Sequence, residues 1–173
     1  MTAGKLGRVS LVLGGARSGK SRIAEALVTD RPAPWVYLAT GQAYDAEMQA
    51  RIDLHRTSRG EQGWQTIEEP YDVPNVIRSV GSAPVLIDCL TLWLTNLILD
   101  DRDIRLATTD LLQALVERDH LTVLVGNEVG LGIVPENALA RRFRDEAGLL
   151  HQRVAAIADE VLFVAAGLPL KLK

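Results

Sequence analysis

The chain has 173 residues, of which 47% are hydrophobic and 24% charged, a composition typical of one soluble globular domain spanning residues 1–173. Its net charge of −3 gives no global basic field and argues against nucleic acid as a partner. No apolar run approaches the roughly 18 residues of a membrane span, and one cysteine excludes an internal disulfide, so a cytoplasmic location is the default expectation.

Strand-like and helix-like stretches alternate along the whole chain. Apolar runs predict strands over residues 8–13, 35–39, 65–68, 85–88, 122–125 and 160–165, with a closing hairpin strand over 170–173. Helical spacing predicts helices over residues 20–29, 45–58, 73–80, 90–99, 104–118 and 137–158. Several strands are continuously apolar, which favours an α/β fold with helices on both faces of a mainly parallel sheet.

The first predicted strand runs into a phosphate loop of the form G-x-x-x-x-G-K-S, which reads Gly14-Gly15-Ala16-Arg17-Ser18-Gly19-Lys20-Ser21. Glycines let the backbone fold around an anion, and the following helix N-terminus favours negative charge. Lys20 is expected to reach the β- and γ-phosphates, and the Ser21 hydroxyl to ligate Mg²⁺. The chain is therefore expected to bind a nucleoside triphosphate, in a three-layer P-loop NTPase fold of the RecA-like kind with a C-terminal edge hairpin.

Polar residues follow the predicted strands at the end where parallel sheets bind their ligands. These strand-end residues are Thr40, Gly41, Gln42, Asp88, Asn127 and Glu128. Asp88 closes an apolar run, as in a Walker B element, where a carboxylate holds magnesium, usually through water. Asp88 and Ser21 are therefore the predicted Mg²⁺ residues.

The predicted helix 45–58 carries His55, for which the residues leave two interpretations open. Two apolar residues precede it at helical spacing, so His55 can be a partly buried histidine at the end of a core stripe. Alternatively, Arg51, His55 and Arg59 are four apart and share a neighbouring face. Flanking guanidinium groups would keep the imidazole neutral and attract phosphates, and a neutral imidazole can attack phosphorus directly.

The other histidines and the cysteine are expected to be structural. His120 precedes a buried-looking strand and His151 lies inside the last predicted helix, so each should be solvated or satisfied by a partner. Cys89 is expected to be a small buried hydrophobe. No two histidines stand at metal-ligand spacing, so zinc is not indicated.

In these motifs the chain resembles the bifunctional adenosylcobinamide kinase and adenosylcobinamide-phosphate guanylyltransferase family of cobalamin biosynthesis. The likeness covers nearly the whole chain, and its most specific block is residues 127–137, Asn-Glu-Val-Gly-Leu-Gly-Ile-Val-Pro-Glu-Asn. The other matching blocks are the phosphate loop and residues 39–42, 47–56, 64–68, 88–96, 140–153, 158–161 and 167–171. The chain has Leu54 where some relatives carry a second histidine, and Asp88 where some carry glutamate.

The resemblance implies that His55 is the residue that becomes covalently guanylylated. It places the nucleotide contacts on Gly14 to Ser21, Thr40, Gly41, Gln42, Arg56, Thr57, Ser58, Arg59, Glu68 and Asp88. It also implies a small corrinoid substrate, adenosylcobinamide and then its phosphate, and assembly as a homotrimer.

Two reactions follow from the resemblance. In the kinase step, ATP or GTP held by Lys20, Ser21 and magnesium gives its γ-phosphoryl group to the hydroxyl of the corrinoid's aminopropanol arm. In the transferase step, His55 displaces pyrophosphate from GTP, and the cobinamide phosphate takes GMP from the histidine to give adenosylcobinamide-GDP. The competing readings are a non-catalytic RecA-like nucleotide switch and a small-molecule kinase of another pathway.

Overall fold

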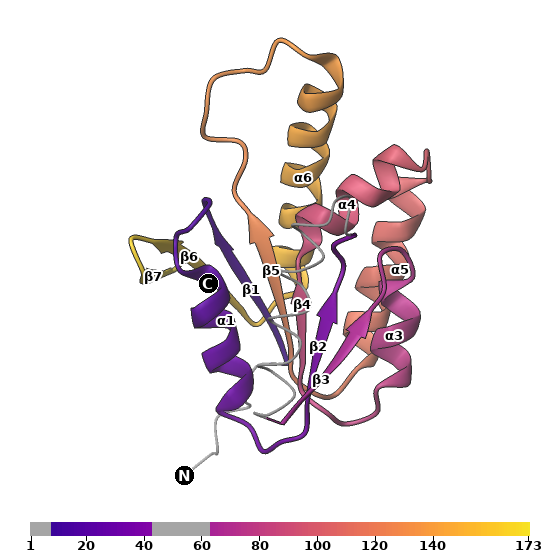
Figure 1. Ribbon diagram of the computed structural model, residues 1–173, viewed down its shortest axis with the longest axis vertical. Coiled ribbons are helices and arrows are strands. Elements are labelled where there is room, and N and C mark those ends of the chain that lie inside the picture. The colour runs from indigo at the N-terminus through magenta and orange to yellow at the C-terminus, as the bar shows by residue number, and fades with distance from the viewer. Residues whose placement is uncertain (1–7, 43–62) are drawn as a thin grey trace.

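The computed structural model describes residues 8–42 and 63–173, where strands and helices alternate as the sequence predicts (Figure 1). The strands are β1 (Val9–Gly14), β2 (Trp35–Ala39), β3 (Trp64–Glu68), β4 (Val85–Asp88), β5 (Thr122–Asn127), β6 (Glu160–Ala165) and β7 (Leu168–Lys171). The helices are α1 (Lys20–Thr29), α3 (Val73–Ser79), α4 (Leu90–Leu99), α5 (Ile104–Glu117) and α6 (Ala138–Ile157). The helix predicted over residues 45–58 lies outside the described residues.

The strands form one seven-stranded sheet within the described residues, in the order β3-β2-β4-β5-β1-β6-β7. Strands β1 to β6 pair in parallel, whereas β7 turns back and pairs antiparallel with β6, as predicted for the C-terminal hairpin. Parallel pairing brings the carboxyl ends of six strands to one edge of the sheet. At this edge Gly14 is opposite Asn127, and Ala39 is opposite both Asp88 and Glu68.

The sheet is buried on both faces because successive side chains of each strand point to opposite sides. On one face, Val12 and Leu86 share a buried cluster with Ala24 and Val28, which lie four residues apart on α1. On the other face, strand residues such as Leu11 pack with α3, α4, α5 and α6. Figure 1 shows α1 across the sheet from these helices. The predicted three-layer α/β architecture is confirmed.

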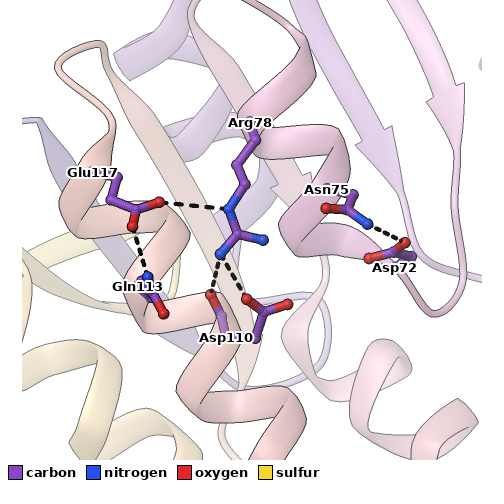
Figure 2. Close-up of polar contacts among 6 residues, drawn as sticks. All are labelled: Asp72, Asn75, Arg78, Asp110, Gln113 and Glu117. Carbon is purple, nitrogen blue, oxygen red and sulfur yellow. Dashed lines mark hydrogen bonds and ion pairs between the residues drawn. The ribbon is translucent and has the colours of Figure 1, made fainter.

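Side-chain contacts join α3 to α5 on the helix-rich face (Figure 2). The Arg78 guanidinium donates to the Asp110 carboxylate at 2.6 Å, and its Nε lies 3.5 Å from the Glu117 carboxylate. Gln113 donates to the second Glu117 oxygen at 2.7 Å. These side chains are partly exposed, so water screens the charges and each pair adds little stability.

A buried arginine ties the end of α5 to the turn after α3. Arg118 is 8% exposed, and its guanidinium donates to the carbonyls of Ile77 at 3.3 Å, Gly81 at 2.5 Å and Ala83. Burial lowers the pKa of Arg118 from its usual value. The fixed fork of guanidinium donors can satisfy several carbonyls at once, including those that the end of a helix leaves without partners.

Candidate nucleotide site

The phosphate loop joins β1 to α1 at the carboxyl edge of the sheet. Two of its residues have left-handed backbone angles, Arg17 with φ 55° and Gly19 with φ 94°. The Ser18 N–H donates to the Gly15 carbonyl at 3.3 Å, which closes a tight turn inside the loop. Turns of this kind direct successive N–H groups into one concavity, a geometry that binds anions.

The N-terminus of α1 adds positive potential beside the loop. Its N-cap residue is Gly19, so no side chain caps the first N–H groups, and the first turn has no acidic residue. Unpaired N–H groups and the helix dipole both favour an anion there. Lys20 is only 9% exposed, and its Nζ folds back to donate to the Gly15 carbonyl at 3.1 Å. Lys20 thus places a full positive charge against the loop, and Ser21 follows it in the first turn. Contacts of Lys20 with phosphates and of Ser21 with Mg²⁺ stay predictions.

Close packing under the loop requires glycine at position 14. A Cβ atom on Gly14 would lie 2.5 Å from Ser18 Oγ and 2.6 Å from the Val164 carbonyl oxygen. A Cβ atom on Gly15 would meet nothing within 4 Å. The sequence pattern therefore contains a glycine that the fold needs for space at position 14, and one at position 15 that it does not.

Asp88 lies on the same face and edge of the sheet as the start of α1. It ends β4, which β5 separates from β1, so the two strand ends are roughly 10 Å apart at about 4.8 Å per strand. Leu86, two residues earlier, packs in the α1-side cluster, so Asp88 points toward that side. Tyr37 of β2, also in that cluster, donates its hydroxyl proton to Asp88 Oδ2 at 2.7 Å. One carboxylate oxygen of Asp88 is thereby fixed.

Thr40, which directly follows β2, is fully buried and bonded to the start of α4. Its hydroxyl accepts from the Cys89 N–H at 2.9 Å and donates to the Cys89 carbonyl at 2.7 Å. Its own carbonyl accepts from Asn96 Nδ2 at 2.7 Å. These bonds fix the chain just before Gly41 and Gln42, which are half-buried. A nucleotide contact of Thr40, Gly41 and Gln42 stays a prediction.

Glu68 is exposed at the end of β3, the strand at the far edge of the sheet. Four inter-strand spacings separate β3 from β1, which is roughly 19 Å. A nucleotide whose phosphates occupy the loop could therefore reach Glu68 only through its base or ribose.

The remaining predicted site residues are His55, Arg56, Thr57, Ser58 and Arg59, and they lie outside the described residues. Gln42, the last described residue before them, follows β2 at the carboxyl edge of the sheet. Their roles stay predictions.

Cys89 and His120, two of the three side chains expected to be structural, have the environments predicted for them. Cys89 is buried, and this burial together with the neighbouring Asp88 charge raises the pKa of its thiol. A thiol with a raised pKa stays protonated and is a poor nucleophile. His120 is exposed to solvent.

His151 differs from the prediction that it is solvated or satisfied. It is only 7% exposed, and its Nε2 has no hydrogen-bond partner in the part of the chain that the structure describes. A Cβ atom on Gly126 would lie 2.6 Å from that nitrogen, so the imidazole packs on bare backbone of β5. Burial lowers the pKa of His151, an effect that the nearby Glu128 charge opposes. Helical periodicity placed His151 in α6 but could not show this environment.

Sequence reasoning missed Tyr37 and Gly167 at this site, and it missed the contact between Arg22 and the C-terminal hairpin. The Gly167 N–H donates to the Ser18 carbonyl of the loop at 2.8 Å, and Arg22 donates to the Gly167 carbonyl at 3.2 Å. Strand alternation could have placed Tyr37 on the face of Asp88. No local signal relates Gly167, in the C-terminal hairpin, to the phosphate loop.

Comparison with known proteins identifies the family. A family model described as cobinamide kinase / cobinamide phosphate guanyltransferase matches residues 10–172. The chain belongs to this family. It is 49% identical over 167 residues to the bifunctional adenosylcobalamin biosynthesis protein CobP of Pseudomonas aeruginosa, covering 94% of this chain and 96% of that protein. It is 43% identical over 180 residues to the bifunctional adenosylcobalamin biosynthesis protein CobU of Escherichia coli, with 94% and 98% covered.

Solved structures resemble this member of the cobinamide kinase family in fold. The flagellar accessory protein FlaH from Methanocaldococcus jannaschii superposes with a TM-score of 0.54 at 11% identity, over 96% of this chain and 78% of that one. The P4 protein from bacteriophage phi6, in complex with ADP, gives a TM-score of 0.51 at 18% identity, over 95% of this chain and 54% of that one. At these identities the likeness concerns the fold alone, and it confirms the predicted RecA-like P-loop NTPase fold.

Proposed function

We propose that the protein is an adenosylcobinamide kinase and adenosylcobinamide-phosphate guanylyltransferase of cobalamin biosynthesis. The observation that carries the proposal is the family match over residues 10–172, joined to a phosphate loop that is folded for anion binding. Two relatives that are 49% and 43% identical are named bifunctional adenosylcobalamin biosynthesis proteins. The family description names both reactions, which favours this function over a nucleotide switch or a kinase of another pathway.

In the kinase step, the phosphate loop binds the triphosphate of ATP or GTP. The N–H groups of the loop and of α1 offset negative charge on the phosphates, and Lys20 supplies a point charge at the β- and γ-oxygens. The corrinoid hydroxyl oxygen forms a bond to the γ-phosphorus as the bond to the β-phosphate oxygen breaks, and the hydroxyl proton passes to water. The protein contributes mainly position and charge to this reaction.

Mg²⁺ fits the donors at this edge of the sheet. The Ser21 hydroxyl and the Asp88 carboxylate are oxygen ligands, which Mg²⁺ prefers, and both belong to the α1 side of the sheet. The ends of β1 and β4 are roughly 10 Å apart, which leaves room for an ion that keeps several of its waters. When bound, the ion would neutralise charge on the phosphate oxygens.

In the transferase step, His55 is the nucleophile. Its imidazole nitrogen forms a bond to the α-phosphorus of GTP, and pyrophosphate leaves. An oxygen of cobinamide phosphate then attacks the same phosphorus, and the histidine is released as adenosylcobinamide-GDP forms. Arg56, Thr57, Ser58 and Arg59 follow His55 directly and would contact the same nucleotide, with Glu68 at its base or ribose.

We also propose a single domain over residues 1–173, assembly as a homotrimer and a cytoplasmic location. No helix within residues 8–42 and 63–173 has the length and apolar character needed to cross a bilayer. Sedimentation equilibrium at micromolar concentration should give three times the chain mass of 18.9 kDa. A concentration-independent mass of one chain would refute the trimer.

Substitution of Lys20 tests the kinase step. Lys20→Ala should lower the cobinamide-dependent transfer of the γ-phosphoryl group by about a hundredfold, because one preorganised electrostatic contact to the reacting group is lost. Lys171→Ala, which removes an exposed lysine of β7, is the matched control and should keep normal turnover. Normal turnover by Lys20→Ala, or nucleotide consumption that does not respond to the corrinoid, would contradict the proposal.

A further inference from the structure

The turn between β6 and β7 is packed directly against the phosphate loop. The Gly167 N–H donates to the Ser18 carbonyl at 2.8 Å. Arg22, in the first turn of α1, donates from Nη2 to the Gly167 carbonyl at 3.2 Å. A Cβ atom on Gly19 would lie 3.1 Å from Gly167 Cα, so the two backbones touch. Three separate contacts therefore join the C-terminal hairpin to residues 18–22.

The bond to Ser18 also sets the direction of the next N–H group. The Ser18–Gly19 peptide is trans, and in a planar trans peptide the C=O and N–H bonds point in opposite directions. The Ser18 carbonyl points at Gly167, so the Gly19 N–H points away from the hairpin. An N–H group that is turned away from the hairpin can donate to an anion bound in the concavity of the loop.

The hairpin holds this contact through an unusual backbone conformation. Ala166 and Gly167 have φ 52° and 76°, which forms a tight turn between antiparallel strands. Glycine adopts such angles without cost, whereas other residues are strained there, apart from asparagine and aspartate, which tolerate them best. The Arg22 guanidinium fixes the carbonyl of the same residue whose N–H holds the loop.

We infer that Gly167 and Arg22 are positioning residues of the nucleotide site, which hold the Ser18–Gly19 peptide so that the Gly19 N–H faces the phosphates. This inference rests on the proposed function, since it takes the phosphate loop as the nucleotide site. It makes the turn between β6 and β7 part of that site, although no residue of the turn needs to touch the nucleotide.

Matched glycine substitutions test this inference. Gly167→Ala and Gly81→Ala each place alanine at a positive φ, and Gly81, at φ 60° after α3, has nothing within 4 Å of its Cβ position. Gly167→Ala should weaken GDP binding about fivefold, because strain at φ 76° displaces the turn and weakens the bond from its N–H to Ser18, whose net contribution is of this size. Gly81→Ala should bind GDP as the native protein does. Denaturant unfolding shows that each variant is folded under the conditions of the titration.

Two further variants separate positioning from general damage. Arg22→Met removes the bond to the Gly167 carbonyl and should weaken GDP binding about threefold, because this exposed bond is worth less. Gly167→Asn keeps a residue that tolerates the left-handed conformation, so it should bind GDP within about twofold of the native protein. If Gly167→Ala does not fold, the GDP affinity of Arg22→Met alone tests the inference.

Lys20→Ala is the reference for the nucleotide site itself. If Lys20→Ala weakens GDP binding while Gly167→Ala and Arg22→Met bind like Gly81→Ala, the inference is overturned and the proposed site stands. If Lys20→Ala binds GDP as tightly as the native protein, the loop is not the nucleotide site, and the proposed function fails together with the inference.

Discussion

Asp88 shows how one carboxylate gains a defined direction from a neighbouring strand. The Tyr37 hydroxyl donates to Asp88 Oδ2 at 2.7 Å, which leaves Oδ1 for the water shell of a metal ion. Asp88→Asn should raise the Mg²⁺ concentration for half-maximal kinase activity about tenfold, because a neutral amide attracts the cation less. GDP affinity measured without metal should not change.

Tyr37→Phe should produce the same change as Asp88→Asn at smaller amplitude, about threefold, since it removes one hydrogen bond but not the charge. Tyr71→Phe is the matched control. The centroid of the Tyr71 ring lies 4.1 Å from Arg102 Cζ, so this tyrosine packs on another side chain than Asp88. An Asp88→Asn variant with native Mg²⁺ dependence would remove Asp88 from the metal site.

His151 makes stability depend on pH. Burial lowers its pKa in the folded protein, so below about pH 6.5 the unfolded chain takes up a proton that the folded chain resists. The free energy of unfolding should therefore be fully retained above that pH and fall as the pH drops toward 5.5. His151→Leu should show a shallower fall in urea titrations at pH 7.5 and 5.5, whereas the exposed His120→Gln should match the native protein. Equal pH slopes for His151→Leu and the native protein would show that His151 does not carry the effect.

At the scale of elements, the buried Arg118 guanidinium donates hydrogen bonds to three backbone carbonyls near the end of α3 and in the turn after it. Arg118→Met should lower the free energy of unfolding by roughly 2 kcal/mol, because the carbonyls near the end of α3 lose a charged donor in a buried place. Arg78→Met, which breaks exposed pairs between the same two helices, should change stability little. If the two variants lose the same stability in denaturant titrations, burial is not the reason for the importance of Arg118.

The positions of the elements could be predicted from sequence because their periodicity is local. The predicted boundaries in the described residues are wrong by at most two residues, and the errors have physical causes. The sequence prediction places Asn137 inside a helix, but it is the N-cap of α6, where its side chain accepts from the N–H groups of Leu139 and Ala140. Strand β5 extends to Asn127 because it pairs with Gly14 there.

The contacts between elements could not be predicted from local patterns. The loop residues Lys20 and Ser21 form a motif, so the sequence predicts their place in the nucleotide site. Tyr37 and Gly167 reach the site only because β2 lies beside β4 and because the hairpin folds back onto the loop. Strand order and turn packing are properties of the folded chain, and no short window of sequence contains them.

At the scale of the whole molecule, the strand order separates two predicted nucleotide contacts along the carboxyl edge of the sheet. The phosphate loop is near one end of the parallel strands, and Glu68 is at the other, four strands away. A nucleotide held by its triphosphate in the loop therefore extends across β5, β4 and β2 when its base or ribose reaches Glu68. In the sequence, His55 lies between β2 and β3.

The central claim is that one domain binds GTP and forms a covalent bond between His55 and the α-phosphorus. The most direct test is incubation with GTP labelled at the α-phosphorus, followed by denaturation and measurement of acid-labile label on the chain. The native protein and His120→Ala should carry the label, GTP labelled at the γ-phosphorus should leave none, and His55→Ala should carry none. Full α-label on His55→Ala, or no label on the native protein, would contradict the account.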